Sequence, residues 1–444
     1  MSYIINTEMI GDLFHNHPVL FIVSLILQIL VVGIGLYYFV VSWFCWYTKK
    51  EKLPEPLKTH TYALLVAAHN EEAVIANSVK SLLALDYPRE AYDVFVIADN
   101  CTDRTAEVAR EAGAIVCERT NDKERGKGFA LEWMFKNLWD MDKQYDSIAV
   151  FDADNVIDKN FLKAINEKQN AGHKVVQGYI DSKNPFDSWI TSSYTISFWT
   201  TNKLYQQSRS NLGLSCQLCG TGFVIDSELL KEIGWQATCL TEDIEFTMRL
   251  VMENQRVGYT RKAIVYDEKP LTLSQSWKQR IRWMQGQTDV AFRFVGKLFK
   301  KAFKTHSWAP VDCVFYLLQP LRIICSGAIT FMAWVQTFYS VTVDPTEQIP
   351  FLQMWNIIHI PHLWDAIVIL TFLYTPLIIW LEKRKFNWTL IKAYITYFFY
   401  SLTWIPIAII GVCKKNNHEW FHTQHTRTLT IDEMNDAGVP IEKK

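Results

Sequence analysis

Residues 147–154 read Ser-Ile-Ala-Val-Phe-Asp-Ala-Asp, a short apolar run that ends in two aspartates. Such a run is typical of a strand buried on both faces of a parallel sheet. Two more apolar runs lie at 62–67 and 94–97. Three helical patterns alternate with the runs, at 71–85, 105–112 and 128–139. This alternation predicts an α/β domain with a doubly wound, mostly parallel sheet. Ligands of such sheets bind outside the carboxyl ends of the strands.

The two acids that follow the strand at 147–151 are Asp152 and Asp154. Alternate side chains of an extended segment point to one side, so we expect both carboxylates to face the same ligand. Two carboxylates and two phosphates together suit Mg²⁺ or Mn²⁺, which prefer oxygen ligands. The alternative is a pair of solvated loop acids, but their place at a strand end favours a metal site.

Two further polar groups lie near strand or helix ends. Asp99 follows the run at 94–97, where a carboxylate could contact a uracil edge or a ribose hydroxyl, whereas Asp103 is expected to cap the helix that begins near Thr105. Lys127 lies in Arg125-Gly-Lys-Gly128, a flexible turn before a helix. That turn suits a diphosphate and equally suits a surface loop.

Thr241-Glu242-Asp243 precedes a helical pattern that reaches Val251. One interpretation is structural, because Thr is a favourable N-cap and acids in the first turn complement the helix dipole. A capping carboxylate can still be a base. Displacement of a nucleotide from an anomeric carbon needs a carboxylate that takes the proton of the acceptor hydroxyl, and Asp243 is our candidate.

Residues 279–283 read Gln-Arg-Ile-Arg-Trp, and in a helix Gln279, Arg282 and Trp283 share one face. An indole offers a flat apolar surface to a sugar ring, a guanidinium suits phosphate oxygens, and an amide both donates and accepts. A basic amphipathic helix beside a membrane would also contain Arg and Trp. Gly220-Thr221-Gly222 permits close backbone approach and fits a loop at the acceptor end.

Residues 18–47 are almost uncharged and are followed by Lys49, Lys50 and Lys52, which predicts a transmembrane helix with residues 1–17 outside and the polar domain 55–270 in the cytoplasm. A basic amphipathic stretch at 273–305 suits the inner membrane surface. Three more apolar stretches predict further crossings within 310–413, at 312–339, 362–381 and 390–413.

Four crossings would place the tail 414–444 outside, whereas Lys414 and Lys415 favour the cytoplasm. A re-entrant segment or a helix broken near Pro406 would remove this conflict. The formal net charge of -1 and the pI near 6.8 argue against a nucleic-acid partner. The nine cysteines show no framework spacing, so we expect them to be reduced, and the lone Cys216-x-x-Cys219 is a poor zinc site.

Taken in order, the motifs resemble those of the family 2 processive glycosyltransferases, such as cellulose, hyaluronan, chitin and poly-N-acetylglucosamine synthases. The motifs are Ala68-His-Asn-Glu71, Asp99, Lys127, Asp152-Ala-Asp154, Thr241-Glu-Asp243 and Gln279-x-x-Arg282-Trp283. The resemblance covers residues 60–290. It implies a GT-A fold, a UDP-sugar donor, inverting β-transfer, Mg²⁺ or Mn²⁺, and a membrane channel for the growing polymer.

The resemblance also implies a role for each matching residue. The donor would contact His69, Asn70, Glu71, Asp99, Lys127, Asp152, Gln279 and Arg282. The metal would bind Asp154 with Asp152. Catalysis would use Asp243, with Glu242 beside it. The acceptor would contact Trp283, Gly220, Thr221 and Gly222. A gating loop that covers the donor would include Trp420, Thr423, His425, Thr426 and Arg427.

Two features depart from the family. Many relatives have Asp-Asp-Gly where this chain has Ala98-Asp99-Asn100, and no cyclic-dinucleotide module follows the last apolar stretch. We therefore expect a multi-pass plasma-membrane synthase that polymerises UDP-glucose into a β-glucan of 1,4, 1,3 or mixed linkage. The alternatives are a UDP-N-acetylglucosamine polymerase, a hyaluronan-like enzyme with two donors, a non-processive glycolipid synthase, and an inactive scaffold subunit.

Overall fold

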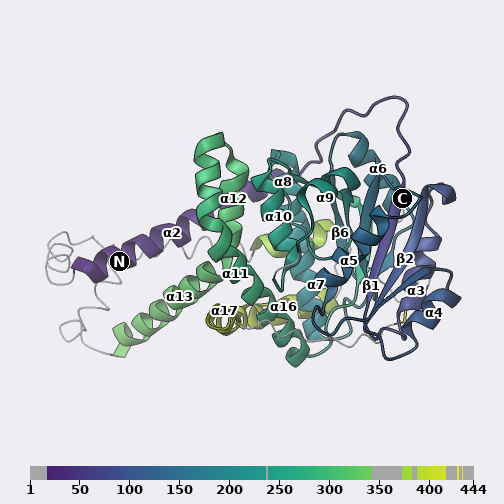
Figure 1. Cartoon of the computed structure of the whole chain (residues 1–444). Helices are drawn as coiled ribbons and strands as arrows, with labels where there is room; N and C mark the ends of the chain where they lie inside the picture. The colour runs from purple at the N-terminus through teal and green to yellow at the C-terminus, as the bar shows by residue number, and fades with distance from the viewer. Residues whose placement is uncertain are drawn as a thin grey trace.

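The computed structural model describes residues 18–236, 239–342, 373–382, 388–416, 428–429 and 433. Its centre is an eight-stranded sheet with the order β3-β2-β1-β4-β7-β6-β8-β5 (Figure 1). The strands are β1 (Tyr62–Ala68), β2 (Tyr92–Asp99), β3 (Ile115–Arg119), β4 (Ser147–Asp152), β5 (Val156–Ile157), β6 (Val175–Ser182), β7 (Phe223–Asp226) and β8 (Val257–Asp267).

Most neighbouring strands are parallel. β1 pairs in parallel with β2 and β4, β2 with β3, and β6 with β8, whereas β7 is antiparallel to both β4 and β6, and β5 is antiparallel to β8. Six strands therefore run in one direction and end at one edge of the sheet. This confirms the mostly parallel sheet predicted from the apolar runs.

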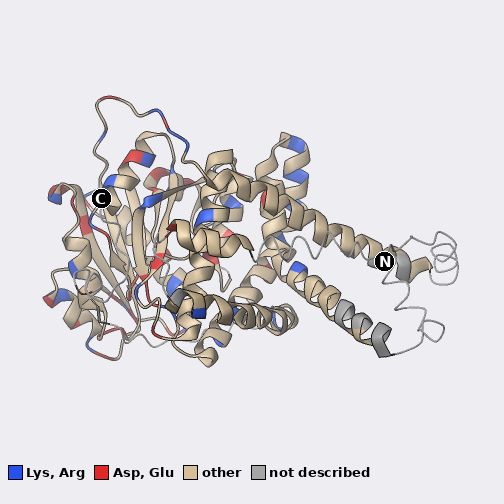
Figure 2. Ribbon diagram, turned by 180° about the vertical axis from the view of Figure 1, so that it is seen from behind, with Lys and Arg blue, Asp and Glu red and all other residues tan. Residues whose placement is uncertain are grey.

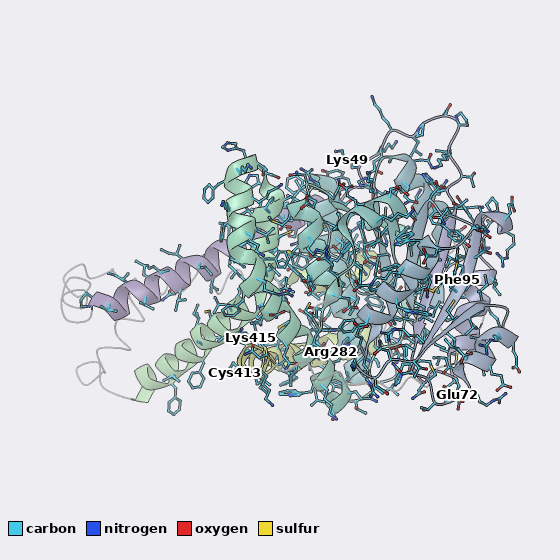
Figure 3. All side chains as sticks on the ribbon, in the orientation of Figure 1. Lys49, Glu72, Phe95, Arg282, Cys413 and Lys415 are labelled. Atoms are coloured by element: carbon cyan, nitrogen blue, oxygen red, sulfur yellow. The ribbon has the colours of Figure 1, made fainter. Side chains whose placement is uncertain are left out.

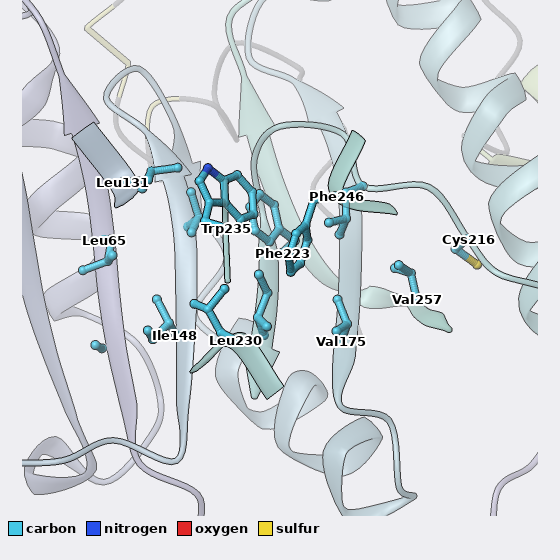
Figure 4. Close-up of a cluster of buried hydrophobic side chains, with 14 of the residues drawn as sticks. Leu65, Leu131, Ile148, Val175, Cys216, Phe223, Leu230, Trp235, Phe246 and Val257 are labelled. Carbon is cyan, nitrogen blue, oxygen red and sulfur yellow. The ribbon is translucent and has the colours of Figure 1, made fainter. Parts of the chain in front are cut away.

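Helices cover both faces of the sheet, and each face has its own apolar core. One core contains residues of α3 (Ile75–Leu83), α4 (Thr105–Glu111) and α6 (Phe161–Asn170), and the other contains residues of α5 (Lys127–Trp139), α7 (Trp189–Thr200), α9 (Ser227–Ile233) and α10 (Glu242–Met252). In the second core Trp235 stacks on Phe223 and packs against Phe246 (Figure 4). The helix expected from residue 71 begins at Ile75, because residues 72–74 form turns.

The longest helix is α11 (Leu273–Thr305), with 33 residues. Its start is fixed by a capping box, in which the Thr272 hydroxyl accepts from the Gln275 backbone N–H and the Gln275 side-chain oxygen accepts from the Thr272 backbone N–H. α12 (Trp308–Leu317) packs back along α11, and α13 (Gln319–Thr342) leaves the domain beside α2 (Pro18–Ser42) (Figure 1).

The stretch 312–339, for which a crossing is predicted, contains a break, because α12 and α13 meet at Leu318 with a bend of 56°. Pro320 has no backbone N–H, so the Tyr316 carbonyl cannot receive its usual helical bond. Gln287 of α11 donates to that carbonyl instead, at 2.6 Å. The missing N–H of Pro320 and the hydrogen bond from Gln287 together stabilise the break between the two helices.

Two described helices are long and apolar enough to cross a membrane, Leu25–Cys45 and Ile391–Cys413, or three if α12 and α13 form one bent span. The second comprises α16 (Trp388–Leu402) and α17 (Trp404–Cys413), which are separated by Thr403, three residues before Pro406. The predicted crossing at 362–381 lies largely outside the described residues, which contain the helix Leu373–Glu382 from that part of the chain.

Short helical segments connect the sheet domain to the apolar helices. They are η1 (Trp43–Cys45), the π-helix η3 (Thr201–Gln207) and α8 (Ser208–Leu212). A further short helix, η2 (Arg89–Ala91), precedes β2 within the sheet domain. Arg209 of α8 forms a buried ion pair with Asp312 of α12, with Nε 2.7 Å from Oδ2. Tyr37 of α2 donates to the other oxygen of Asp312 at 3.0 Å. The N-terminal helix is thus joined to the sheet domain by a buried polar contact.

The described part of the tail returns to the sheet domain. The Thr428 carbonyl accepts a hydrogen bond from the Asn77 side chain of α3, and Leu429 packs against an apolar core of the sheet. Residues 428–429 therefore lie against the sheet domain. The residues of the expected gating loop, Trp420, Thr423, His425, Thr426 and Arg427, lie outside the described residues.

Candidate active site

Charged side chains gather at the edge where the parallel strands end. Lys127 begins α5, and its ammonium donates to an oxygen of Asp152 at the end of β4 and to the Gly220 carbonyl at 2.7 Å. Burial lowers the pKa of Lys127, but the nearby carboxylates, first of all Asp152, outweigh this effect and raise it. A cation with a raised pKa stays charged, as a diphosphate site requires.

Asp152 and Asp154 differ in their surroundings, and the strand alternation expected for them is wrong. β4 ends at Asp152, and the chain turns at residues 153–154. Asp152 meets Lys127, whereas the buried Asp154 accepts from the Glu268 backbone N–H at 2.9 Å and from the Asn155 amide at 3.3 Å. Two hydrogen bonds from the protein thus fix the Asp154 carboxylate.

Asn155 was not singled out from the sequence, yet its buried amide links three chain segments. Its oxygen accepts from the Asp152 backbone at 3.1 Å and from the Thr221 hydroxyl. Its nitrogen donates to Asp154 and to Asp267 at the end of β8, each at 3.3 Å. The only sequence signal was its position beside the Asp-x-Asp pair.

Asp99 ends β2 and is held by Arg119, which ends the neighbouring strand β3. Arg119 Nη1 lies 2.6 Å from Asp99 Oδ1, and both side chains are buried. Asn100 donates to the same oxygen at 3.1 Å. The pairing with Arg119 follows from the β2–β3 register, in which the two residues are direct partners. It fixes the orientation of the Asp99 carboxylate.

The turn after β1 contains His69, Asn70 and Glu71 and lies against the turn after β2. His69 Nδ1 is 2.7 Å from the Asp99 carbonyl, and Asn70 adopts a φ of 55° and accepts from the Thr102 backbone N–H at 2.8 Å. The Glu71 backbone donates to the Thr105 hydroxyl at 2.8 Å. These bonds hold the two turns together at the sheet edge.

Glu242 and Asp243 begin α10 and are half-buried. Removal from water raises the pKa of Asp243 to about 7; Glu242 adds to this rise, whereas Lys127 and Arg282 oppose it. Removal from water also raises the pKa of Glu242, again against Lys127 and Arg282. Two acids and two cations from three helices therefore act on one another within a single site. One of the cations, Arg282, is labelled in Figure 3.

The loop Gly220-Thr221-Gly222 lies between the Lys127 and Asp243 side chains. Gly220 and Gly222 have positive φ values of 79° and 63°, which glycine adopts without strain. A Cβ on Gly220 would lie 3.6 Å from an Asp243 oxygen. Gly220 therefore lies next to the Lys127 and Asp243 side chains, and the acceptor role of this loop stays a prediction.

α11 presses against the start of α10 at Gly286. A Cβ on Gly286 would lie 2.9 Å from the Thr241 Cβ and closer still to the ends of the Thr241 side chain. Thr241 immediately precedes Glu242 and Asp243. The absence of a side chain at Gly286 therefore sets how closely the two acids approach Arg282 of the same α11 helix.

Gln279 and Trp283 face an aromatic cluster and not the carboxylates. The Tyr194 hydroxyl donates to Gln279 at 2.9 Å, and its ring meets Trp283 edge-on with centroids 6.0 Å apart. Trp283 is partly buried, and Tyr400 and Trp404 complete this wall. The structure thus brings Arg282 to the acids and Trp283 to an aromatic wall beside them.

Arg280, the second residue of the Gln-Arg-Ile-Arg-Trp segment, was overlooked in the sequence. It is fully buried, donates to Thr403 at 2.8 Å, and lies over the rings of Tyr400 and Trp404 at 4.2 and 4.9 Å. Cation–π contacts of this kind attach α11 to the break between α16 and α17. Its spacing from Arg282 already placed it on another helix face.

The remaining predictions concern metals and cysteines. Within the described residues, no group of three His, Cys, Asp or Glu side chains could hold a metal by itself. Cys216 and Cys219 are therefore not part of such a group. All nine cysteines are described and none forms a disulfide, as predicted.

Residues 60–286, about half of the chain, match the sequence model described as glycosyltransferase like family 2. The chain belongs to glycosyltransferase family 2. It is therefore a sugar-transferring enzyme, which confirms the family and the enzyme class predicted from its motifs.

Curated relatives of this family 2 glycosyltransferase include three kinds of protein. The probable glycosyltransferase YdaM of Bacillus subtilis is 26% identical over 390 residues, 85% of this chain and 86% of its own. A beta-monoglucosyldiacylglycerol synthase of Nostoc sp. is 31% identical and a poly-beta-1,6-N-acetyl-D-glucosamine synthase of Staphylococcus epidermidis 28% identical. Those two matches cover 50% and 52% of this chain and 48% and 55% of the relatives.

Among solved structures, the mannosyltransferase PcManGT from Pyrobaculum calidifontis, in complex with GDP-Man and Mn²⁺, superposes with a TM-score of 0.58. The match covers 90% of this chain and 99% of PcManGT at 16% identity, so it bears on the fold alone. The sheet domain of this family 2 glycosyltransferase is thus the GT-A fold that the sequence predicted.

We predict that Gly286→Ala lowers the rate of sugar transfer by about 10- to 100-fold, because a displaced Thr241 moves the acids that follow it. UDP affinity should change little. Gly296→Ala on the same helix is the control, since a Cβ there meets nothing within 4 Å. Equal rates for the two variants, measured with purified protein, would contradict the proposed role of this contact.

Proposed function

We propose that this chain is a membrane-embedded, processive, inverting β-glycosyltransferase that polymerises UDP-glucose into a β-glucan and passes the chain outward through its apolar helices. The observation that carries the proposal is the gathering of Lys127, Asp152, Asp243 and Arg282 in one site, with the aromatic wall of Trp283 beside it.

The donor would lie along the edge of the sheet. Arg119 and Asn100 donate to Oδ1 of Asp99, and Oδ2 would accept a hydrogen bond from the N–H of uracil. Lys127 and Arg282 would bind the diphosphate, and a cationic pair suits its charge. Gln279 lies on the Arg282 helix and would add a hydrogen bond.

Asp154 and Asp152 would hold Mg²⁺ or Mn²⁺. The residues fit such an ion because Asn155 and the Glu268 backbone orient the Asp154 carboxylate. The described protein groups do not complete a coordination shell, so donor phosphate oxygens would supply the other ligands. Bound there, the ion supplies positive charge to the departing diphosphate. The fold relative PcManGT was solved with Mn²⁺.

The proposed reaction is a single displacement. The acceptor hydroxyl gives its proton to the Asp243 carboxylate while its oxygen forms a bond to the anomeric carbon. The bond from that carbon to the diphosphate oxygen breaks on the opposite side, and UDP leaves with the electron pair. Attack from the opposite side inverts the anomeric carbon from α to β. Lys127 and Arg282 stabilise the charge that develops on UDP.

The choice of product rests on the aromatic wall. Trp283 is only partly buried, and its indole would offer a flat apolar surface to a sugar ring of a polymer. Tyr194 and Tyr400, which are 1% exposed, would support the indole from within the protein. The Nostoc relative is named for a glucolipid and the Staphylococcus relative for poly-N-acetylglucosamine, so a non-processive glycolipid synthase and a UDP-N-acetylglucosamine polymerase are the second candidates.

The proposed location is the plasma membrane, with several crossings and the catalytic domain in the cytoplasm. Lys49, Lys50 and Lys52 follow the N-terminal span, which favours this orientation. The contact of Thr428 with Asn77 keeps the tail near the catalytic domain. The gating loop predicted for residues 420–427 would then be able to cover the donor.

We predict that purified protein, supplied with labelled UDP-glucose and Mn²⁺, makes a polymer that linkage-specific glucanases digest. Trp283→Ala should reduce chain elongation more than it reduces hydrolysis of the donor, because the indole contacts the acceptor. Label that extracts into organic solvent as lipid would support the glycolipid candidate. If polymer forms from UDP-N-acetylglucosamine and not from UDP-glucose, the donor is UDP-N-acetylglucosamine.

We predict that kcat/KM falls about tenfold per pH unit below pH 7, because protonated Asp243, whose pKa is raised to about 7 by burial, cannot accept the proton of the acceptor. Asp243→Asn should lose about 100-fold or more in rate and retain UDP affinity. A variant that keeps the parent rate, or a parent rate that does not change between pH 6 and 8, would exclude Asp243 as the base.

A further inference from the structure

Side chains from several elements fix the backbone of the pre-β7 segment (residues 217–222), which ends in the two glycines beside the candidate base. Gln177 of β6 is fully buried and holds the later part of this segment. Its Oε1 accepts from the Cys219 backbone N–H at 3.0 Å, and its Nε2 donates to the Thr221 carbonyl at 2.9 Å. The start of the segment is held by side chains from two other elements.

Gln206 of η3 holds the first residue of the pre-β7 segment with both ends of its amide. Nε2 of Gln206 donates to the Gln217 carbonyl at 2.7 Å, and Oε1 accepts from the Gln217 backbone N–H at 3.0 Å. Nε2 also lies 3.5 Å from Cys219 Sγ. Because Gln206 and Gln217 are 2% and 4% exposed, water could not easily replace these bonds. Loss of the amide would therefore remove two hydrogen bonds from the backbone of a buried residue.

Thr247 of α10 joins the pre-β7 segment to the candidate base. Its hydroxyl donates to the Asp243 carbonyl at 2.8 Å and accepts from the Leu218 backbone N–H at 3.2 Å. The side chain is fully buried. The same segment contains Gly220, whose carbonyl accepts from Lys127 at 2.7 Å. The segment therefore connects the residue proposed to bind the diphosphate to the residue proposed to act as base.

η3, which contains Gln206, is a π-helix of seven residues between α7 and α8. The π-helix is rare in proteins and occurs frequently at functional sites. Two contacts hold η3 on different sides. Asn202 donates to the Ile180 carbonyl of β6 at 2.9 Å, and Tyr205 meets Tyr38 of α2 edge-on with ring centroids 5.4 Å apart. The sheet and the N-terminal helix together therefore fix the position of Gln206.

The next residue of η3, Gln207, has the same side chain and a different partner. Its Nε2 donates to Asn211 Oδ1 at 3.1 Å, and the Asn211 amide donates to the Phe44 and Tyr47 carbonyls at 2.7 and 2.6 Å. These carbonyls follow α2, which contains no Lys, Arg, Asp or Glu and extends away from the sheet domain (Figure 2). Of the two adjacent glutamines, Gln206 thus bonds to the pre-β7 segment and Gln207 bonds to the residue that holds the end of α2.

We propose that Gln206 and Thr247 are positioning residues, which hold the pre-β7 segment so that the acceptor hydroxyl is aligned with the anomeric carbon. The proposal rests on the proposed function, in which Asp243 activates this hydroxyl, and it holds for a glucan and for a lipid acceptor. A displaced segment would move Gly220 relative to Lys127 and Asp243, and a misplacement of about 1 Å can lower a rate about 100-fold. A water molecule can approach the donor from more directions than a sugar can, so hydrolysis of the donor should fall less than transfer.

The test compares Gln206→Met with the parent enzyme as purified full-length protein. Methionine is also long and unbranched, but it lacks the amide. With labelled UDP-glucose and Mn²⁺, the label in any transfer product and the label released as free hexose are measured separately. We expect transfer to fall about 10- to 100-fold and hydrolysis to fall less, with UDP affinity unchanged. Equal losses of transfer and hydrolysis would show a structural role alone and overturn the proposal.

A matched control and a second variant separate positioning from general damage. Gln207→Met places the same substitution on the adjacent buried residue, whose amide bonds to Asn211, and it should keep the parent ratio of transfer to hydrolysis. Thr247→Val keeps the branched shape, removes the hydroxyl, and should lower the ratio as Gln206→Met does. A control that lowers the ratio equally, or a folded Thr247→Val with the parent ratio, would overturn the proposal.

A second measurement does not depend on catalysis. Backbone hydrogen exchange in peptides that cover residues 217–219 should be at least about tenfold faster in Gln206→Met than in the parent, because the Gln217 N–H loses its acceptor. Exchange in Gln207→Met should match the parent. A parent that transfers no sugar from either UDP-glucose or UDP-N-acetylglucosamine would contradict the proposed function and leave this expectation unchanged. Equal exchange in Gln206→Met and the parent would overturn the positioning role.

Discussion

The structure depends on one geometric constraint, which is that parallel strands deliver their last residues to the same edge of a sheet. Asp99 and Asp152 are separated by more than fifty positions in the chain, yet both end strands at this edge. Gathering carboxylates in this way is unfavourable unless cations accompany them. Lys127 and Arg282 supply that charge, and the balance leaves Asp243 with a pKa near neutrality. In the proposed reaction, Lys127 and Arg282 would bind the diphosphate, and Asp243 would accept the proton of the acceptor hydroxyl.

α11 packs against both the apolar helices and the residues at this edge of the sheet, so it fixes their relative position. On one side, Gly286 allows Thr241, the residue before α10, to contact the helix. On another, Gly411 of α17 meets the backbone of Met284, and Gln285 donates to the Lys414 carbonyl at 3.0 Å. Small residues allow helices to approach this closely. The position of Asp243, the proposed base, therefore depends on contacts that lead directly to the apolar helices.

The sequence was sufficient for the sheet and for the charges at its edge, because apolar runs and strand-end acids are local signals. The roles of Asn155 and Arg119 could not be predicted, since their partners Thr221, Asp267 and Asp99 become neighbours only through the pairing of strands. The bend at Leu318 has a cause that is visible in the sequence, namely Pro320. The alternation of side chains does not extend to Asp154, because β4 ends at Asp152.

The most direct test of this account is the affinity for UDP with and without Mn²⁺, measured by calorimetry on the parent protein and on Asp154→Asn. If the strand edge gathers a metal and a diphosphate as proposed, the parent should bind UDP tightly only when Mn²⁺ is present. The folded variant should bind it weakly under both conditions. UDP affinity that is the same with and without the metal, or the same in the parent and the variant, would contradict the central claim.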